Sequence, residues 1–431
     1  MGEGIMIIRV IDYIANHGGG MRISSEIIYA LLDLQPDVEF ELVSHGAALA
    51  RYQALLSPLG GRVRFVDVKP GGSWGARYPK VLQAAYAAQL FGLPGLLKER
   101  HFDVPEAALE NCAVAWLPWL MQHRVPNSFS PKVMASFHDT ILMTESLLDP
   151  FFARFVADEK ETTCQWLASN ARIVVSSRNT VSVLGQMLGA RPERFDLVPF
   201  SGRNARLHAK EDKAPEGEWT RRPFLLCPAN TAPHKNHKVL LRGVGQWGGR
   251  RSLVLTGLGT ELNPPRARSL LSICENLGIV PLTRQTQLRR LAESSGLTIG
   301  DKLIPLGYVS EEVYYSLLKR TWALVMPTLA EGGGSGPVYE ALLCGIPVLC
   351  SDIPVLREQM ERLGAHVLWF DPHHHEDLAR RLKELEQNYE QYKDIAVQQV
   401  SRLNPLTWRD VAEDYWRIML STASQAGGKS V

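Results

Sequence analysis

Two glutamates enclose a glycine-rich stretch in the C-terminal half of the chain. Glu331 and Glu340 flank the segment GGGSGPVY, in which four glycines leave backbone amides uncovered and Pro337 stands where a helix could begin. A proline suits the first position of a helix, because it has no amide hydrogen to lose there. Free amides at a helix N-terminus favour an anion or a polyhydroxyl group, and a carboxylate accepts two hydrogen bonds side by side. The segment therefore favours a sugar over a free phosphate, with both carboxylates facing it.

Three further segments place polar or flexible residues just after predicted strands. Lys235 stands at the start of a helix in FLLCPANTAPHKNHKVLL, and Asn230 precedes it in the same loop. His138 ends the strand in KVMASFHDT, and Gly19 and Gly20 belong to a glycine triplet between the first strand and the next helix. In open α/β sheets, ligands bind at the carboxyl ends of the strands. These residues are therefore candidates for ligand contacts.

Each candidate also has a structural explanation. Glycine-rich loops are common, and the helix dipole favours a glutamate in a first helical turn regardless of function. Without further information, His138 is more typical of a core or capping histidine. For Lys235, the structural explanation would be a solvated lysine at a helix start. This explanation is unattractive, because the helix dipole disfavours a cation at that position.

The composition indicates a globular protein of two domains. A chain of 431 residues with 45% hydrophobic and 21% charged residues exceeds one ordinary core. The net charge of +2 lacks the cationic excess of a dedicated nucleic-acid binder. The six cysteines form no CxxC pair, which favours a reducing compartment and a cytoplasmic location.

Two segments suggest a metal site or a membrane contact. The tract PHHHED at residues 372–377 resembles a metal-binding tract, but consecutive histidines splay their rings, and no Asp-x-Asp sequence occurs in the chain. We therefore expect no metal. The stretch from Lys80 to Arg100 is amphipathic with basic ends, so it could lie on a bilayer surface, although a core helix is the favoured interpretation.

Short apolar runs alternate with longer helical patterns in two series, which predicts two parallel sheets with helices on both faces. A polar, charged segment between Ser201 and Arg222 separates the two series. We expect domains at residues 1–205 and 206–403, followed by an amphipathic helix at 404–420 and a disordered tail at 421–431.

The segment GYVSEEVYYSLLKRTWALVMPTLAEGGGSGPVYEALLCGIPVLCSDIPVLRE resembles the C-terminal core of the family 4 retaining glycosyltransferases. Those enzymes carry two glutamates, with seven residues between them, around a glycine-rich loop. Here eight residues intervene, Gly332 to Tyr339. The resemblance is strong over the C-terminal half and weak over the N-terminal half. It implies the GT-B fold: two Rossmann-like doubly wound domains that face a cleft, and a C-terminal helix that crosses back to the first domain.

The resemblance also implies roles for individual residues. By position, it assigns Glu331 to the donor hexose, Glu340 to the ribose diol and Lys235 to the diphosphate. The family usually has an arginine five or six residues before this lysine, where this chain has Ala229 and Asn230 instead. The implied catalytic residues are His138, Lys235 and Glu331. The further donor-binding candidates are Gly19, Gly20, Asn230, Gly332, Gly333, Gly334, Ser335, Gly336 and Glu340.

The implied activity is that of a retaining hexosyltransferase without a metal or other cofactor. It would move a hexose, such as mannose or glucose, from a UDP- or GDP-sugar to a hydroxyl of a glycan or lipid-linked saccharide in polysaccharide biosynthesis. No carboxylate nucleophile is evident, so the resemblance implies same-face attack assisted by the leaving phosphate. Two alternatives stay open: a sugar-nucleotide epimerase of the same fold, and a non-catalytic protein that binds sugar nucleotides.

Overall fold

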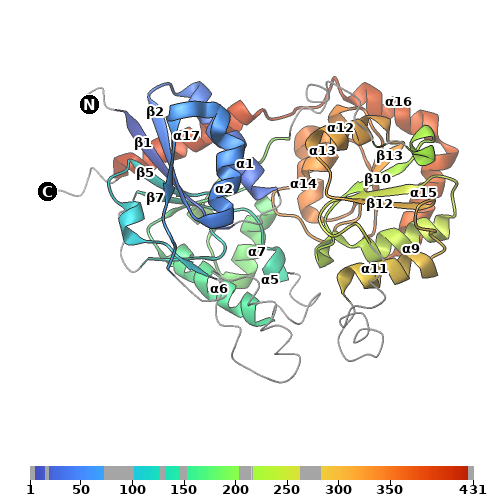
Figure 1. Cartoon of the computed structure of the whole chain (residues 1–431), viewed down its shortest axis with the longest axis horizontal. Coiled ribbons are helices and arrows are strands. Elements are labelled where there is room, and N and C mark those ends of the chain that lie inside the picture. Colours follow the sequence, from blue (N-terminus) through green and yellow to red (C-terminus); the bar gives the residue numbers. More distant parts are fainter. Residues whose placement is uncertain are drawn as a thin grey trace. The chain divides into compact units, whose positions relative to one another are not determined.

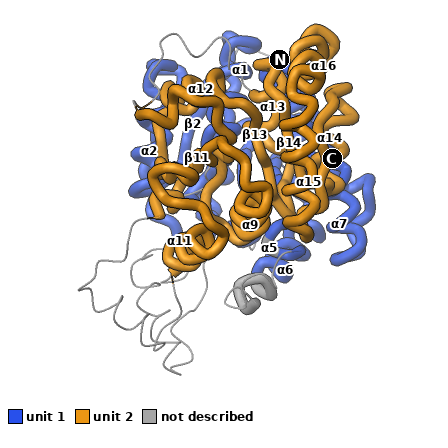
Figure 2. The backbone as a smooth tube through the Cα atoms, turned by 90° about the vertical axis from the view of Figure 1, so that its right-hand side faces the viewer, with its two compact units in different colours: residues 1–201, 406–431 blue, residues 202–405 orange. Residues whose placement is uncertain are grey.

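The chain consists of two compact units, each built around a parallel sheet. A computed structural model describes residues 5–14, 19–71, 101–126, 132–144, 153–202, 215, 217–262 and 283–425. Unit 1 holds Met1–Ser201 and Leu406–Val431, and unit 2 holds Gly202–Pro405 (Figure 1, Figure 2). The stretch from Lys80 to Arg100 lies outside the described residues, as do most of the predicted linker and the end of the predicted tail.

Unit 1 contains a seven-stranded sheet in the order β3-β2-β1-β5-β7-β8-β9. All neighbouring strands run parallel. The strands are β1 (Met6–Ile11), β2 (Val38–Ser44), β3 (Val63–Asp67), β5 (Val114–Leu117), β7 (Val133–Phe137), β8 (Arg172–Val175) and β9 (Phe195–Leu197). A separate parallel pair joins β4 (Phe102–Asp103) to β6 (His123–Arg124).

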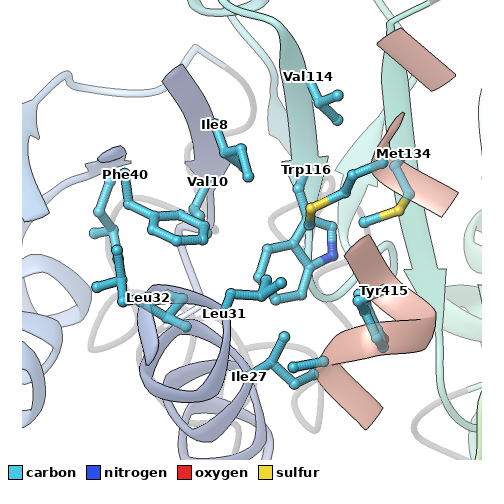
Figure 3. Packing of buried hydrophobic residues seen from close by; sticks show 14 of the residues in the cluster. Ile8, Val10, Ile27, Leu31, Leu32, Phe40, Val114, Trp116, Met134 and Tyr415 are labelled. Carbon is cyan, nitrogen blue, oxygen red and sulfur yellow. The ribbon is translucent and has the colours of Figure 1, made fainter. Parts of the chain in front are cut away.

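The C-terminal helix α17 (Trp408–Gln425) belongs to unit 1 and packs on helix α1 (Gly20–Leu34). Its Tyr415 is fully buried, and its ring lies 5.4 Å from that of Trp116 on β5 (Figure 3). The Tyr415 hydroxyl lies 3.3 Å from Ser136 Oγ on β7. The same core contains Ile8 and Phe40 (Figure 3). The predicted return of the C-terminal helix to the first domain is thus confirmed, and the helix continues to Gln425, beyond the expected end at Leu420.

The other helices of unit 1 connect its strands in chain order. Helix α7 shows the usual sequence signals at both ends: Ser177 Oγ accepts a hydrogen bond from the amide of Thr180, and Gly189 ends the helix in the left-handed region. The helices are α2 (Gly46–Leu56), α5 (Ile141–Thr144), α6 (Ala153–Ala168) and α7 (Arg178–Leu188).

Unit 2 contains a six-stranded parallel sheet in the order β12-β11-β10-β13-β14-β15. The chain adds strands on one side of β10 as far as β12, then returns to place β13 on its other side. The reversal between β10 and β13 is the position at which such sheets bind ligands. The strands are β10 (Leu225–Pro228), β11 (Leu253–Thr256), β12 (Leu303–Gly307), β13 (Ala323–Met326), β14 (Val348–Ser351) and β15 (Leu368–Phe370).

Helices cover both faces of this sheet. Alternate residues of β13 point to opposite faces, so Leu324 joins a cluster with α12–α14 residues, whereas Val325 joins a cluster with α9, α11 and α15 residues. The helices are α9 (His237–Trp247), α11 (Arg284–Ser294), α12 (Glu311–Arg320), α13 (Gly336–Leu343), α14 (Pro354–Leu363), α15 (His375–Gln387) and α16 (Tyr389–Gln399). The α/β class and the two Rossmann-like sheets are as predicted.

Among the described residues, no helix has the length and apolarity that crossing a membrane requires.

Candidate functional site

Lys235 and Glu331 meet where the strand order of unit 2 reverses. Lys235 ends the short 3-10 turn Pro233–Lys235 that follows β10, and Glu331 follows β13. Lys235 Nζ lies 2.5 Å from Glu331 Oε1, and the two side chains are 17% and 10% exposed. The amide of Leu329 and the hydroxyl of Thr328 donate to the carbonyl of His234, which ties the two loops together. The ion pair is therefore built by neighbouring strands and remains accessible to a ligand.

Two histidines beside Lys235 are held in the neutral form. Burial, together with the neighbouring charge of Lys235, lowers the pKa of His234 to about 3. Burial also lowers the pKa of the fully buried His237 to about 3, followed by the charges of Arg284 and Lys235. Both rings are thus uncharged at neutral pH, and the positive charge of this loop resides on Lys235.

The glycine-rich loop is held by a side chain from helix α14. Gln359 on α14 accepts a hydrogen bond from the amide of Ser335 at 2.9 Å and donates one to the Ser335 carbonyl at 3.1 Å. Gly334 has a φ of +108°, and a Cβ atom there would lie 2.7 Å from Gln359 Cδ. Only glycine fits this position without displacing the glutamine. Gln359 therefore fixes the loop that carries the additional residue.

Helix α13 begins at Gly336, one residue before the predicted start at Pro337. The reason is that Ser335 is the capping residue: its side chain accepts a hydrogen bond from the amide of Val338. Pro337 still lies in the first turn, where its missing amide hydrogen does no harm. Gly332 and Gly333 lie in the irregular segment between β13 and this cap.

The second glutamate has a different environment from the first. Glu340 lies on α13 and is 2% exposed. Tyr314 Oη donates to Glu340 Oε2 at 2.7 Å, and Tyr315 Oη donates to Glu340 Oε1 at 3.5 Å. The sequence suggested that both carboxylates face one ligand, and the structure adds that Glu340 is fixed by tyrosine hydroxyls from helix α12.

Asn230 and Arg284 belong to the same loop region. Asn230 Oδ1 accepts a hydrogen bond from the amide of Ala232, so the side chain shapes the turn after β10. Arg284, the first residue of α11, donates from Nε to the carbonyl of Thr231 at 3.2 Å. A guanidinium therefore reaches the loop in which the resembled family has an arginine. No sequence pattern indicates this contact, because Arg284 and Thr231 are far apart along the chain.

The other candidates lie in unit 1. His138 follows β7, is 2% exposed, and has its ring 5.2 Å from that of Trp119 and 4.6 Å from that of Phe200. Gly19 and Gly20 lie at the start of helix α1, with Gly19 as the exposed residue before it. The structure thus groups Asn230, Lys235, Glu331, Glu340 and the glycine loop within unit 2, separately from the unit 1 candidates.

The histidine tract shows local pairing. His374 Nδ1 lies 2.9 Å from Asp371 Oδ2, and this hydrogen bond raises the pKa of the exposed His374. Across the described part of the chain, no group of three or more histidine, cysteine or carboxylate side chains could hold a metal ion.

Residues 209–399 match the family model "Glycosyl transferases group 1". No curated protein sequence matches the chain. Among solved structures, sucrose-phosphate synthase from Thermosynechococcus elongatus has a TM-score of 0.65 at 13% identity, covering 97% of this chain and 100% of that one. HepE from Anabaena, in complex with UDP and glucose, has a TM-score of 0.56 at 15% identity, covering 98% of each chain. WaaG, a glycosyltransferase involved in lipopolysaccharide biosynthesis, has a TM-score of 0.57 at 11% identity, covering 96% and 99%. These likenesses show the fold.

Proposed function

From the premise that residues 209–399 belong to the glycosyl transferases group 1 family, we propose that the chain is a retaining hexosyltransferase. It takes a hexose from a nucleoside-diphosphate sugar and transfers it to a hydroxyl of a glycan or lipid-linked saccharide. The observation that carries this proposal is the ion pair of Lys235 and Glu331 at the strand-order reversal of unit 2. Its two halves have the chemistry that the two ends of such a donor require.

Lys235 matches the diphosphate end of the donor. A diphosphate carries negative charge, and more charge develops on it as the bond to the sugar breaks. A lysine that is 17% exposed and paired to a carboxylate can exchange that carboxylate for phosphate oxygens. Arg284 adds a second cationic side chain to the same loop, and its charge can stabilise the diphosphate as the bond to the sugar breaks.

Glu331 matches the sugar end. Once Lys235 turns to the diphosphate, the carboxylate can accept hydrogen bonds from hexose hydroxyls. In the proposed reaction, the bond from the anomeric carbon to the phosphate oxygen breaks and a bond to the acceptor oxygen forms on the same face. The acceptor's proton passes to the departing phosphate oxygen. The protein supplies orientation and charge, and no enzymic base is required.

The donor and acceptor are proposed from the comparisons. HepE was solved with UDP and glucose, so UDP-glucose is the first donor to test, followed by GDP-mannose. WaaG acts in lipopolysaccharide biosynthesis, which supports a surface polysaccharide or its lipid-linked precursor as the acceptor class. We further propose that turnover needs no metal, so activity should persist in EDTA.

Incubation with a panel of UDP- and GDP-sugars tests this proposal. Thermal shift identifies the donor that binds, and the release of nucleoside diphosphate is measured with and without saccharide acceptors. We expect acceptor-dependent release and a glycoside whose anomeric configuration matches the donor. Nucleotide release with an epimerised free sugar would support the epimerase instead. Binding without any turnover across the panel would support the non-catalytic alternative.

A further inference from the structure

Asn236 follows Lys235 and adopts a backbone conformation that residues other than glycine rarely take. Its φ is +53° and its ψ is +38°, in the left-handed region. Asparagine tolerates this region better than most residues, but such a backbone costs free energy and persists only where the surrounding structure holds it. The contacts of Asn236 therefore indicate what this conformation serves.

The side chain of Asn236 binds a segment that is distant in the chain. Asparagine is a preferred capping residue, and Asn236 directly precedes helix α9. Its Nδ2 nevertheless donates to the carbonyl of Pro372 at 2.7 Å, and the residue is 6% exposed. This buried hydrogen bond joins the loop after β10 to the segment after β15. Its loss would leave a buried carbonyl without this donor, which is costly.

Pro372 is a firm anchor because the residues on both sides of it are held. It is buried and begins the histidine tract. The amide of Asp371 donates to Asp377 Oδ2 at 2.9 Å, and the amide of His373 donates to Asp371 Oδ1 at 2.8 Å. The tract thus forms a fixed turn, and its first carbonyl accepts the hydrogen bond from Asn236.

The turn that carries Lys235 is tied on both sides of this residue. Before it, the carbonyl of His234 accepts hydrogen bonds from the amide of Leu329 at 2.7 Å and from Thr328 Oγ1 at 3.1 Å. After it, Asn236 is bound to the segment after β15. The segments that follow β13 and β15 therefore fix the backbone, while the side chain of Lys235 stays 17% exposed.

We propose that Asn236 is a positioning residue for the diphosphate: its hydrogen bond to Pro372 fixes the backbone from which Lys235 reaches the phosphate oxygens. This inference rests on the proposed function. A cation stabilises a leaving diphosphate best when it is held where the charge develops, and a displacement of about 1 Å can cost a large part of the rate. Asn236 acts through Lys235, and its own amide group is engaged by Pro372.

Asn236→Gly tests this role by comparing diphosphate with monophosphate ligands. Glycine adopts the left-handed backbone without strain, so the variant keeps the turn and removes the tether. Dissociation constants of UDP and UMP, and of GDP and GMP, are measured by calorimetry. We expect the wild type to favour the diphosphate about tenfold or more, the scale of one hydrogen bond to a charged group. Asn236→Gly should lower this preference about threefold and leave the affinity for the monophosphate nearly unchanged.

Turnover provides a second measurement on the same variant. Lys235 is proposed to act on charge that develops as the bond to the sugar breaks, so misplacing it removes an interaction of the transition state. With the donor found in the panel, kcat should fall about tenfold in Asn236→Gly, whereas KM should change less. A residue that only supports the fold would lower the amount of active protein and leave the kcat of each folded molecule unchanged.

Two further variants separate positioning from a general effect. Asn111 also has a left-handed backbone, with a φ of +55°, but lies in unit 1, so Asn111→Gly should leave the diphosphate preference intact. Lys235→Ala should remove most of the preference. Adding Asn236→Gly to Lys235→Ala should then change the diphosphate affinity little, because both substitutions act through the same cation.

Several results would overturn the inference while the proposed function stands. Equal weakening of diphosphate and monophosphate binding by Asn236→Gly would show that Asn236 supports only the fold. An unchanged preference would show that Lys235 is positioned without the tether, and additive effects in the double variant would show that Asn236 acts independently of Lys235. A wild-type protein that binds nucleotides without preferring the diphosphate would remove the role of Lys235 on which the inference depends. Failure of the wild type to bind any nucleotide or sugar nucleotide would overturn the proposed function as well.

Discussion

The carboxyl ends of the central strands are used differently in the two units. In unit 1, Asp12 directly follows β1 and is fully buried, with Oδ2 accepting from Tyr52 Oη at 2.6 Å and Oδ1 accepting from the amide of Ile14 at 3.0 Å. In unit 2, Lys235 and Glu331 follow neighbouring strands and keep part of their surface exposed. The same kind of sheet thus supports a sealed internal network in one unit and an open ion pair in the other. This difference teaches that position in the fold does not suffice to identify a site, and that access to charged groups must be considered as well.

The comparison predicts the largest effect for Lys235→Ala. Loss of the cation removes charge stabilisation of the leaving diphosphate, which we expect to lower turnover about a hundredfold, or ~2.7 kcal/mol in the transition state. Glu331 is 10% exposed and loses its cationic partner, so the unfolding free energy should fall as well, and turnover is compared per folded molecule. Turnover is measured with the donor found in the panel.

Lys302→Ala provides the control for this substitution. Lys302 directly precedes β12, at the amino end of the sheet, and donates to the carbonyl of Gly249. Its replacement should leave turnover near the wild-type value. Near-wild-type activity of Lys235→Ala would contradict the assignment of the open ion pair as the site.

In unit 1 the matching prediction concerns stability. Tyr52→Phe removes the hydroxyl that donates to the buried Asp12, and burial followed by the charge of Asp12 raises the pKa of this tyrosine well above its usual value. We expect a loss of about 2 kcal/mol in unfolding free energy, because a buried carboxylate loses a donor. Denaturant unfolding measures this, and turnover per folded molecule should be unchanged.

Tyr29→Phe is the reference for Tyr52→Phe. The Tyr29 hydroxyl donates to the carbonyl of Leu55 at an exposed position of the same unit, so its loss should cost less than about 0.5 kcal/mol. If the two substitutions destabilised the protein equally, the sealed character of the Asp12 network would be wrong.

The third prediction is that the buried His237, in the site region of unit 2, makes the folded protein less stable as the pH falls. An unfolded histidine takes up a proton near pH 6.5, whereas His237 in the folded protein does so only near pH 3, mainly because it is buried. Between these values the unfolded state binds more protons, so stability falls as the pH falls, by up to ~1.4 kcal/mol per pH unit. His237→Leu should flatten this dependence between pH 6.5 and pH 5 in urea unfolding.

His374→Gln serves as the comparison for that measurement. The hydrogen bond to Asp371 raises the pKa of His374, so protonation of His374 adds stability as the pH falls. Removing His374 therefore cannot flatten the loss of stability at acid pH. An equally steep fall in His237→Leu would show that His237 is protonated in the folded protein.

The fold could be predicted from the sequence because its signals are local. Alternation of β-branched strands with helical patterns recurs along both halves, and this periodicity is set by residues close together in the chain. The helix that begins after the glycine loop was placed within one residue. The error arose because Ser335, and not Pro337, provides the capping hydrogen bond, and several residues near a helix start can serve as caps.

The candidate site could be predicted only in part. Lys235 and Glu331 were each singled out by their loops, and the strand order places them together. Tyr314, Gln359 and Arg284 were missed. Each acts on a residue distant in the chain, and a tyrosine in an amphipathic helix has the same sequence pattern whether it packs or positions a carboxylate. Side-chain contacts made by tertiary packing leave no periodic signal.

The smallest predicted effect concerns His138, and it tests whether a buried side chain of unit 1 takes part in turnover as the partly exposed ion pair of unit 2 is proposed to do. This histidine follows β7 in unit 1, as Glu331 follows β13 in unit 2, yet His138 is 2% exposed and packed against Trp119 and Phe200. His138→Phe preserves an aromatic ring at this position and removes the polar atoms. If the imidazole hydrogen-bonds a hexose hydroxyl, turnover should fall about threefold to tenfold, the value of one neutral hydrogen bond, with the unfolding midpoint unchanged. Unchanged turnover would instead place His138 with Asp12 among the sealed groups of unit 1, and the contacts with the donor sugar would then have to come from unit 2 residues such as Glu331.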